Sequence, residues 1–324
     1  MSCICPECGC SPALNSEWRW DGQRWTHWHG ILIGHVRTIF AEPESTDFNV
    51  ETISKGEPVK SPVQHRIDNA VSWPLGKRAP RIDKRTFKLT KYLPKLPSAP
   101  ASVEWLPKLN WGVMLNDSIG DCTCAAAGHM IEQWSALSGV EFRIPDSSIL
   151  IAYQAVSGYV PGEPQTDNGA VMLDVLNYWR QNGIGGHKIL AYVSVNLKNQ
   201  NEVKTAVQLF GNIYLGVQLP ISAQGASVWS VPDAGPVGDG SPGSWGGHCI
   251  PIMGYAPTVP TTPAASPLVY TVLTWGKPVH MTSHFLNAYA DEAYCVLSSD
   301  WIDKNGLAPS GFNLAQLQAD LASL

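Results

Sequence analysis

The sequence predicts an α+β domain, with a helical half and a sheet half, behind a small separate amino-terminal module. Helical periodicity is concentrated between residues 122 and 210, and apolar runs typical of strands follow from 213 to 298. The first 99 residues sustain neither pattern. Because helices come first and strands last, the two kinds of element should form separate halves of one domain, with a cleft between them.

Three segments carry apolar residues at i, i+3, i+4 and i+7, the spacing of a helix that buries one face. The stripes are Ala127, Met130, Ile131 and Trp134; Met172, Val175, Leu176 and Trp179; and Val203, Ala206, Val207 and Phe210. The first of these helices should begin near Cys122.

Four apolar runs predict strands, at residues 213–219, 249–255, 268–274 and 293–298. A helix between the last two runs should be capped by Thr282 or Ser283, and a short terminal helix over 314–321 by Asn313. The apolar runs stop well short of the roughly 20 residues that a bilayer span needs, so no transmembrane helix and no membrane partner are expected.

Residues 1–40 are predicted to form a small module rich in cysteine and tryptophan. Asp21-Gly22 between two Trp-rich arms is typical of a short hairpin. The cysteines include one CxxC pair, and with two nearby histidines they could supply the four ligands of a structural zinc ion. The candidates are Cys3, Cys5, Cys8, Cys10, His27 and His29. The alternative is that these thiols are solvent-exposed or oxidised.

Residues 41–99 are rich in proline and charge and are predicted to form an extended basic linker or arm. The chain has a net charge of −5, but residues 77–95 hold eight Lys or Arg and one Asp, +7, which leaves −12 for the rest. We therefore expect the basic arm to be attracted to the acidic body. Nucleic acid is not an expected partner.

The amino terminus, MSCICPECGC, lacks the basic start and apolar centre of a secretory signal. The four cysteines beyond residue 100 are Cys122, Cys124, Cys249 and Cys295, and their scatter indicates no disulfide framework. The expected location is the cytoplasm, or a phage or protein particle assembled there.

The segment NDSIGDCTCAAAGHMIEQW places Cys122 where a helix begins. Unpaired N–H groups and the positive end of the helix dipole favour the thiolate, the nucleophilic form of cysteine. Cys124 lies roughly 200° further around the helix, so only one of the two sulfurs can face a cleft. The structural alternative for either residue is a small buried thiol. His129, two turns along, is expected to have a packing or hydrogen-bonding role.

Around Cys122 the sequence resembles the papain-like cysteine peptidases, as a divergent bacterial or phage member. ASVEW at 101–105 is similar to the start of the mature family domain, and Asn116 stands six residues before Cys122, where the family carries the glutamine of its oxyanion hole. The same count from Cys124 gives Ser118, a poorer donor, which favours Cys122 as the nucleophile. The resemblance covers roughly residues 100–300 and implies two lobes, one helical and one of antiparallel strands.

Two later segments extend the resemblance. DNGAVMLDVLNYWRQNGI is similar to the family's glycine and cleft helix, which implies that Asn168 and Gly169 lie at the substrate-binding face. GGHCIPIMGY is similar to the family's histidine strand, which implies that His248 is the general base. The basic arm before residue 100 then stands in the place of a family propeptide, with an intrinsic linker as the alternative.

The third catalytic position departs from the family. VLTWGKP is similar to the family's Asn-Ser-Trp-Gly, which implies that Trp275 shields the catalytic pair, but Leu273 stands where the histidine's orienting asparagine should be. Leucine accepts no hydrogen bond, so the role must pass to Thr274, to another group, or to none. Leu273 and Thr274 point to opposite faces of a strand, so Thr274 needs a one-residue shift to reach His248.

These residues predict a thiol-dependent hydrolase that cleaves peptide or isopeptide bonds of a peptide or protein substrate, with no cofactor required for catalysis. A catalytically silent papain-like module used in binding or particle assembly is the first alternative. An acyltransferase that uses the same Cys-His chemistry with an amine in place of water is the second.

Overall fold

The computed structural model describes two units of the chain, residues 1–66 and 67–324, which are taken here one at a time. The described residues are 17–20, 24–28, 36–41, 73–93, 96–139, 141–257, 268–301 and 310. The cysteines at positions 3, 5, 8 and 10 and the predicted helix over 314–321 lie outside them. The zinc site and the terminal helix therefore stay predictions.

The first unit contains a three-stranded antiparallel sheet of β1 (Glu17–Trp20), β2 (Arg24–Trp28) and β3 (Val36–Ala41), in that order. β1 pairs with β2 so that Trp20 faces Trp25 across the hairpin. This hairpin lies where Asp21-Gly22 predicted it.

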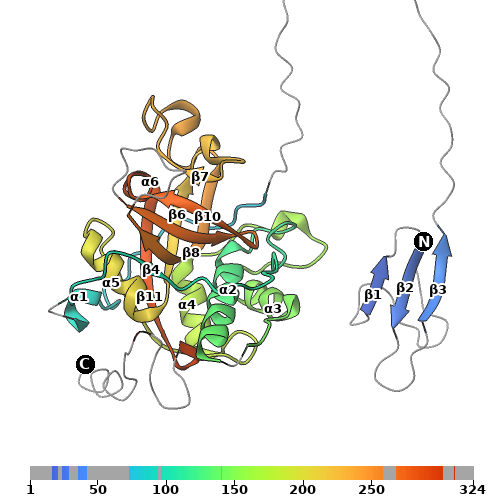
Figure 1. The fold of residues 1–324 in the computed structure, drawn as a ribbon. Helices are drawn as coiled ribbons and strands as arrows, with labels where there is room; N and C mark the ends of the chain where they lie inside the picture. The colour runs from blue at the N-terminus through green and yellow to red at the C-terminus, as the bar shows by residue number, and fades with distance from the viewer. Residues whose placement is uncertain are drawn as a thin grey trace, which may run out of the picture. The chain divides into compact units, whose positions relative to one another are not determined.

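The second unit contains six described helices and eight strands (Figure 1). The helices are α1 (Leu89–Tyr92), α2 (Cys122–Ser138), α3 (Asp146–Ser157), α4 (Met172–Gln181), α5 (Gln200–Phe210) and α6 (Ser283–Tyr289). The strands are β4 (Val103–Glu104), β5 (Ile189–Ser194), β6 (Ile213–Leu219), β7 (Val228–Trp229), β8 (Gly246–Ala256), β9 (Val269–Thr274), β10 (Lys277–Thr282) and β11 (Ala290–Ser298).

The eight strands form one sheet in the order β5-β11-β6-β8-β9-β10-β7, with β4 added to β8. All of its pairs are antiparallel except β10 with β7. Strand β8 lies in the middle and also packs against α2. A residue on β8 can therefore face the helix whose first residue is Cys122.

Two hydrophobic cores fill the second unit, and they correspond to the predicted halves. One is built from α2, α3 and α4, with Trp134 and Trp179 stacked at 5.8 Å between ring centroids, and in Figure 1 the green helices α2 and α3 lie side by side. The other is built from the sheet with α5 and α6. The three predicted helical stripes are buried along their whole length, which confirms the α+β prediction.

The helix ends follow ordinary capping chemistry. α2 is capped at its carboxyl end by Gly139, whose φ of 88° is open to glycine and strained for other residues. α6 is capped at its amino end by Thr282, whose hydroxyl accepts a hydrogen bond from the Phe285 N–H at 3.1 Å. Thr282 is one of the two caps predicted from the sequence.

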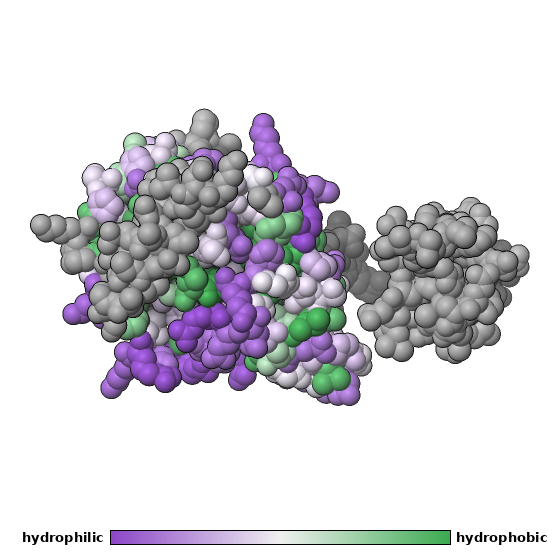
Figure 2. Space-filling view, turned by 90° about the horizontal axis from the view of Figure 1, so that it is seen from below, coloured by the Kyte–Doolittle hydropathy of each residue, from purple (hydrophilic) through white to green (hydrophobic). Residues whose placement is uncertain are grey.

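The described residues on the face drawn in Figure 2 are mainly polar. On the face drawn in Figure 2, hydrophilic residues in purple predominate, with small separate groups of hydrophobic residues in green between them. Among the described helices, none combines the length and the hydrophobicity that crossing a bilayer requires.

Residues 73–93 of the basic arm pack along the second unit. Lys88 forms a bridge with Ser194 of β5, and the Ser194 N–H donates to the Phe87 carbonyl at 2.8 Å. Leu89 of α1 is completely buried in the core of the sheet half. The arm is therefore anchored to the body at its carboxyl end.

Candidate active site

Cys122 is the first residue of α2, where the helix leaves its N–H groups without intrahelical partners. The residue is 1% exposed, and burial raises the pKa of its thiol to about 12. Backbone groups of Gly76 and Cys249 hydrogen-bond to the sulfur and oppose this shift, as donors to a thiolate must. The thiol is therefore protonated at neutral pH in this conformation.

His248 lies on β8, next to Cys249, and is also 1% exposed. Burial lowers the pKa of its imidazole to about 3. Its Nε2 lies 2.8 Å from the Thr274 hydroxyl, and its Nδ1 has no hydrogen-bond partner among the described residues. One ring nitrogen is thus held by Thr274, and the other is free to exchange a proton with a reacting group.

A β-bulge in β8 brings Thr274 to His248. Tyr255 pairs with Tyr270, but Ile252 pairs with Val272, so β8 has one extra residue between Ile252 and Gly254. Residues opposite each other in an antiparallel pair share a face, and faces alternate along a strand. With the bulge, His248 shares its face with Thr274. Without it, His248 would share its face with Leu273. The bulge supplies the one-residue shift that Thr274 was predicted to need.

Trp275 covers one face of the His248 imidazole. Its ring stacks on His248 with centroids 4.5 Å apart and an interplanar angle of 16°. Trp275 and Gly276 form the two-residue turn between β9 and β10, with φ values of 46° and 69°. Both values are positive, as a type I′ hairpin turn requires, and they are strained for Trp275. This turn places the indole where it shields His248 from solvent.

Asn116 precedes α2 in a tight turn and is 3% exposed. Its Nδ2 donates to the Ile119 carbonyl at 3.2 Å. Asp121 is fully buried, and burial raises the pKa of its carboxyl well above the usual range. The Asn116 amide is therefore beside the start of α2, but in this conformation it is occupied by its own loop.

Gly169 lies against Gly76, whereas the Asn168 side chain turns back to donate to the Gln165 carbonyl at 3.1 Å. Gly169 has a φ of 70°, and its N–H donates to the Tyr153 hydroxyl at 3.0 Å. Tyr153 in turn donates to Asp167, which accepts the Gly120 N–H at 2.9 Å. Asp167 and Tyr153 thus tie the turn before Cys122 to Gly169.

Residues 73–77 lie between the helical half and the sheet half beside Cys122, and we call them the covering segment. The Gly76 carbonyl accepts the Ala170 N–H at 2.8 Å, the Lys77 N–H donates to Gly247 at 3.0 Å, and the Arg78 N–H donates to Ala170 at 3.0 Å. The covering segment therefore bridges the helical half and the sheet half, with its backbone paired to both.

Contacts between glycines set how closely the covering segment approaches the residues around Cys122. A Cβ on Gly76 would lie 1.5 Å from the Gly120 carbonyl oxygen, and a Cβ on Gly169 would lie 2.0 Å from the Gly76 oxygen. Trp73 stacks on Trp275 at 5.4 Å between centroids. The segment and the site are thus packed together without space for a side chain at Gly76.

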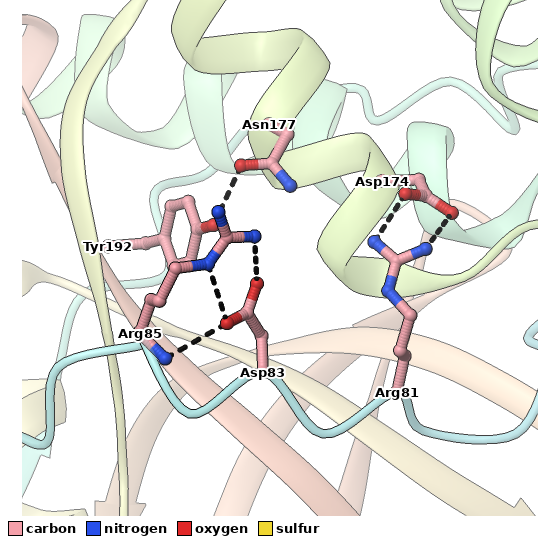
Figure 3. Close-up of polar contacts among 6 residues, drawn as sticks. All are labelled: Arg81, Asp83, Arg85, Asp174, Asn177 and Tyr192. Carbon is pink, nitrogen blue, oxygen red and sulfur yellow. Dashed lines mark hydrogen bonds and ion pairs between the residues drawn. The ribbon is translucent and has the colours of Figure 1, made fainter.

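Beyond the covering segment the arm runs along α4 (Figure 3). Arg81 forms two hydrogen bonds with Asp174, at 3.0 and 2.5 Å, and Arg85 pairs with Asp83. The Arg81 and Asp174 side chains are 49% and 36% exposed, so this pair contributes under about 1 kcal/mol. The Arg81–Asp174 pair therefore orients the arm along α4 but contributes little to the free energy that keeps it bound.

Cys124 and His129 lie apart from the cleft contacts. The polar neighbours that influence the Cys124 thiol are Asp121, Thr123 and Cys122, and the residue is part of the helical core. His129 is buried with its Nε2 2.7 Å from the Gly112 carbonyl oxygen, and burial lowers the pKa of its ring to about 4. His129 therefore has the structural contact that was expected of it.

Sequence reasoning missed the covering segment, Ala170, and the pair of Asp167 and Tyr153. Gly76 had one detectable signal, because glycine is one of the residues that allow a close approach of two backbones. Asp167 and Tyr153 are separated by 14 residues and gave no spacing signal.

No family model and no curated protein sequence matches this chain. Among solved structures, it is similar to xylellain, a cysteine protease from Xylella fastidiosa, at 15% identity and a TM-score of 0.54, over 70% of this chain and 97% of that chain. It is also similar to a recombinant stem bromelain precursor (13%, TM-score 0.44, 70% and 78%) and to procathepsin B from Trypanosoma congolense (9%, TM-score 0.46, 71% and 87%). The fold of the second unit is a papain-like α+β fold.

Proposed function

We propose that this chain is a thiol-dependent hydrolase of peptide or isopeptide bonds, with Cys122 as nucleophile and His248 as base. The observation that carries the proposal is the surrounding of His248. One ring nitrogen is held by Thr274 at 2.8 Å, one face is stacked on Trp275, and the other nitrogen is unpartnered on the strand that packs against the Cys122 helix. A histidine with only a packing role needs no such free nitrogen in a buried site.

The reaction follows from these groups. His248 takes the thiol proton, and the Cys122 sulfur attacks the carbonyl carbon of the substrate. The Cys122 N–H at the start of α2 donates to the developing oxyanion, with the Asn116 amide as a second donor once it leaves its loop partners. The C–N bond breaks as His248 protonates the leaving amine. Water then hydrolyses the thioester, releasing the acid and restoring the thiol.

Thr274 acts as the positioning residue for His248. A hydroxyl can accept a hydrogen bond from protonated Nε2, as the asparagine of the family does, so the imidazole keeps its tautomer and orientation. The Thr274 side chain is short, and its hydroxyl oxygen is neutral. We therefore propose that the triad works with Thr274 in place of the missing amide.

The described conformation is proposed to be a latent form. The Gly76 group at the Cys122 sulfur is a donor, and the Gly76 carbonyl is taken by the Ala170 N–H at 2.8 Å. The covering segment thus presents an N–H, and no attackable carbonyl, to the nucleophile, so it blocks the site without being cleaved. Removal of the segment returns water to the site and lowers the pKa of the thiol.

Hydrolysis of mixed peptide substrates tests the proposal, with the full chain carrying Gly76→Ala to dislodge the covering segment. We expect cleavage products that disappear when Cys122→Ala is added. Products joined to an added amine, in place of hydrolysis products, would instead establish an acyltransferase. Absence of any turnover, with Cys122 accessible to alkylation, would establish the silent binding module.

A further inference from the structure

The buried slot that holds the Lys77 side chain lies beside the proposed nucleophile. This side chain is completely buried, although a lysine outside the protein would be hydrated. Its Nζ donates to Asp291 at 2.8 Å and to the Arg78 carbonyl at 3.2 Å, and it lies 3.1 Å from Glu292 Oε1. Both carboxylates come from β11.

The shape of the slot fits an extended lysine side chain. A Cβ on Gly216 would lie 2.1 Å from Lys77 Cε, so the missing side chain at Gly216 makes the space through which the lysine stem passes. Gln218 donates to Asp291 at 2.7 Å, and Tyr294 donates to Glu292 at 2.9 Å. These two contacts hold the carboxylates in place at the end of the slot.

When Lys77 is absent, the two carboxylates of the slot need another cation to balance their charge. Glu292 is 8% exposed, burial raises the pKa of its carboxyl, and Lys77 opposes that shift. Two neighbouring carboxylates without a cation repel each other and are poorly solvated there. A lysine side chain from another peptide restores the ion pair, whereas an apolar side chain leaves it unmade.

The direction of the covering segment fixes which residue of a substrate would enter. Trp73, which precedes Gly76, stacks on Trp275 beside His248, and Lys77 follows Gly76 on the side of Ala170. A substrate must place its leaving amine at His248, so the residues after its scissile bond lie on the Trp275 side. It therefore runs opposite to the covering segment, and the slot receives the residue just before the one whose carbonyl is attacked.

We propose that this slot is a lysine-selective subsite, so that the chain cleaves one residue beyond a lysine of its substrate. The proposal rests on the proposed hydrolase function for the cleavage, but the binding preference stands on the slot alone. Lys77 occupies the slot in the latent form in the same way that a substrate lysine does in the open form.

Cleavage of paired peptides tests it. The full chain carries Gly76→Ala and Lys77→Ala, which free the cleft and the slot, and the peptides differ only by lysine or norleucine at the second position before the scissile bond. A charge-assisted contact predicts at least about tenfold higher kcat/KM for lysine. Asp291→Asn with Glu292→Gln should bring the ratio within about threefold, whereas Asp174→Asn, a carboxylate outside the slot, should leave it unchanged.

A second variant tests the shape. Gly216→Ala fills the lysine path and should also abolish the preference, while cleavage of peptides with alanine at that position continues. Cleavage without a lysine preference, or a preference that survives Asp291→Asn with Glu292→Gln, overturns the subsite.

Calorimetric binding of the same peptides to the chain with Gly76→Ala, Lys77→Ala and Cys122→Ala, in which the slot is free and the nucleophile is absent, separates the two proposals. At least about tenfold tighter binding of the lysine peptide, lost in the slot variant, supports the subsite even if the chain with Cys122 cleaves nothing. Equal binding of both peptides overturns the subsite, whatever the hydrolytic activity is.

Discussion

His248 and Thr274 are 26 residues apart and meet at 2.8 Å, because a single bulged residue in β8 puts both side chains on one face of the sheet. The hydroxyl stands where an amide was expected from the family resemblance. It is the group in the described site whose removal distinguishes an oriented catalytic histidine from a merely buried one.

Thr274→Val should lower kcat of the open enzyme by about tenfold while KM changes little, because the valine keeps the volume but accepts no hydrogen bond from Nε2. Thr274→Ser should retain most of the activity. Steady-state kinetics in the Gly76→Ala background measure both. Equal activity in the valine and serine variants would show that Thr274 only packs against the ring.

Cys122→Ala should abolish hydrolysis, whereas Cys124→Ala should leave most of it. Cys122 contacts the covering segment through Gly76, whereas the groups that influence the Cys124 thiol are Asp121, Thr123 and Cys122. Activity assays, with circular dichroism to verify folding, compare the two variants. The assignment of the nucleophile is wrong if both folded variants lose activity equally.

Gly76→Ala should speed alkylation of Cys122 by iodoacetamide at neutral pH by at least about tenfold. The added Cβ would lie 1.5 Å from the Gly120 oxygen, so the covering segment must leave, and the thiol pKa must fall from about 12 toward its ordinary 8.5. Peptide mapping by mass spectrometry reports each cysteine separately.

Pro80→Ala is the matched control for this experiment, since Pro80 is an exposed residue of the same arm. It should leave the alkylation rate near that of the unmodified chain. Adding His248→Ala to Gly76→Ala should slow alkylation at about pH 6, because the thiolate then loses its imidazolium partner. An unchanged rate there would argue against the Cys-His pair.

His129 should make the fold less stable as the pH falls from about 6.5 toward 4. Its pKa is lowered to about 4 by burial, so in this range the unfolded chain binds a proton that the folded chain does not, and stability is lost on acidification. The shift corresponds to at most about 3 kcal/mol.

Urea unfolding at pH 7 and pH 4.5 measures this contribution by difference. His129→Gln keeps a donor for the Gly112 carbonyl and removes the titration, so its loss of stability between the two pH values should be smaller. His284→Gln, at an exposed position of α6, is the control and should behave like the unmodified chain. Parallel curves for all three proteins would contradict the prediction.

Zinc in the amino-terminal module is tested by elemental analysis of chain purified without chelators. We expect close to one equivalent if Cys3, Cys5, Cys8 and Cys10, with help from His27 or His29, form a structural site. Replacing Cys5 and Cys8 by serine should then release the metal. Less than about a tenth of an equivalent in the unmodified chain would reject the site.

The sequence by itself determined the elements whose signal is local. Apolar spacing placed α2, α4 and α5, the run of β-formers placed β6, β8, β9 and β11, and the position of Cys122 at the start of a buried stripe identified the nucleophile candidate. Each of these depends on residues within about two helical turns of one another, so a periodicity is enough to reveal it.

Only the tertiary structure decided the contacts made across the sheet and the cleft. The bulge that selects Thr274 over Leu273 appears only when β8 and β9 are paired, because one extra residue inverts the face of every residue beyond it. Gly76 packs against Gly120, and Lys77 lies between Asp291 and Glu292. Both contacts join segments more than 40 residues apart in the sequence. Such contacts are fixed by shape and charge in three dimensions, and no spacing along the chain encodes them.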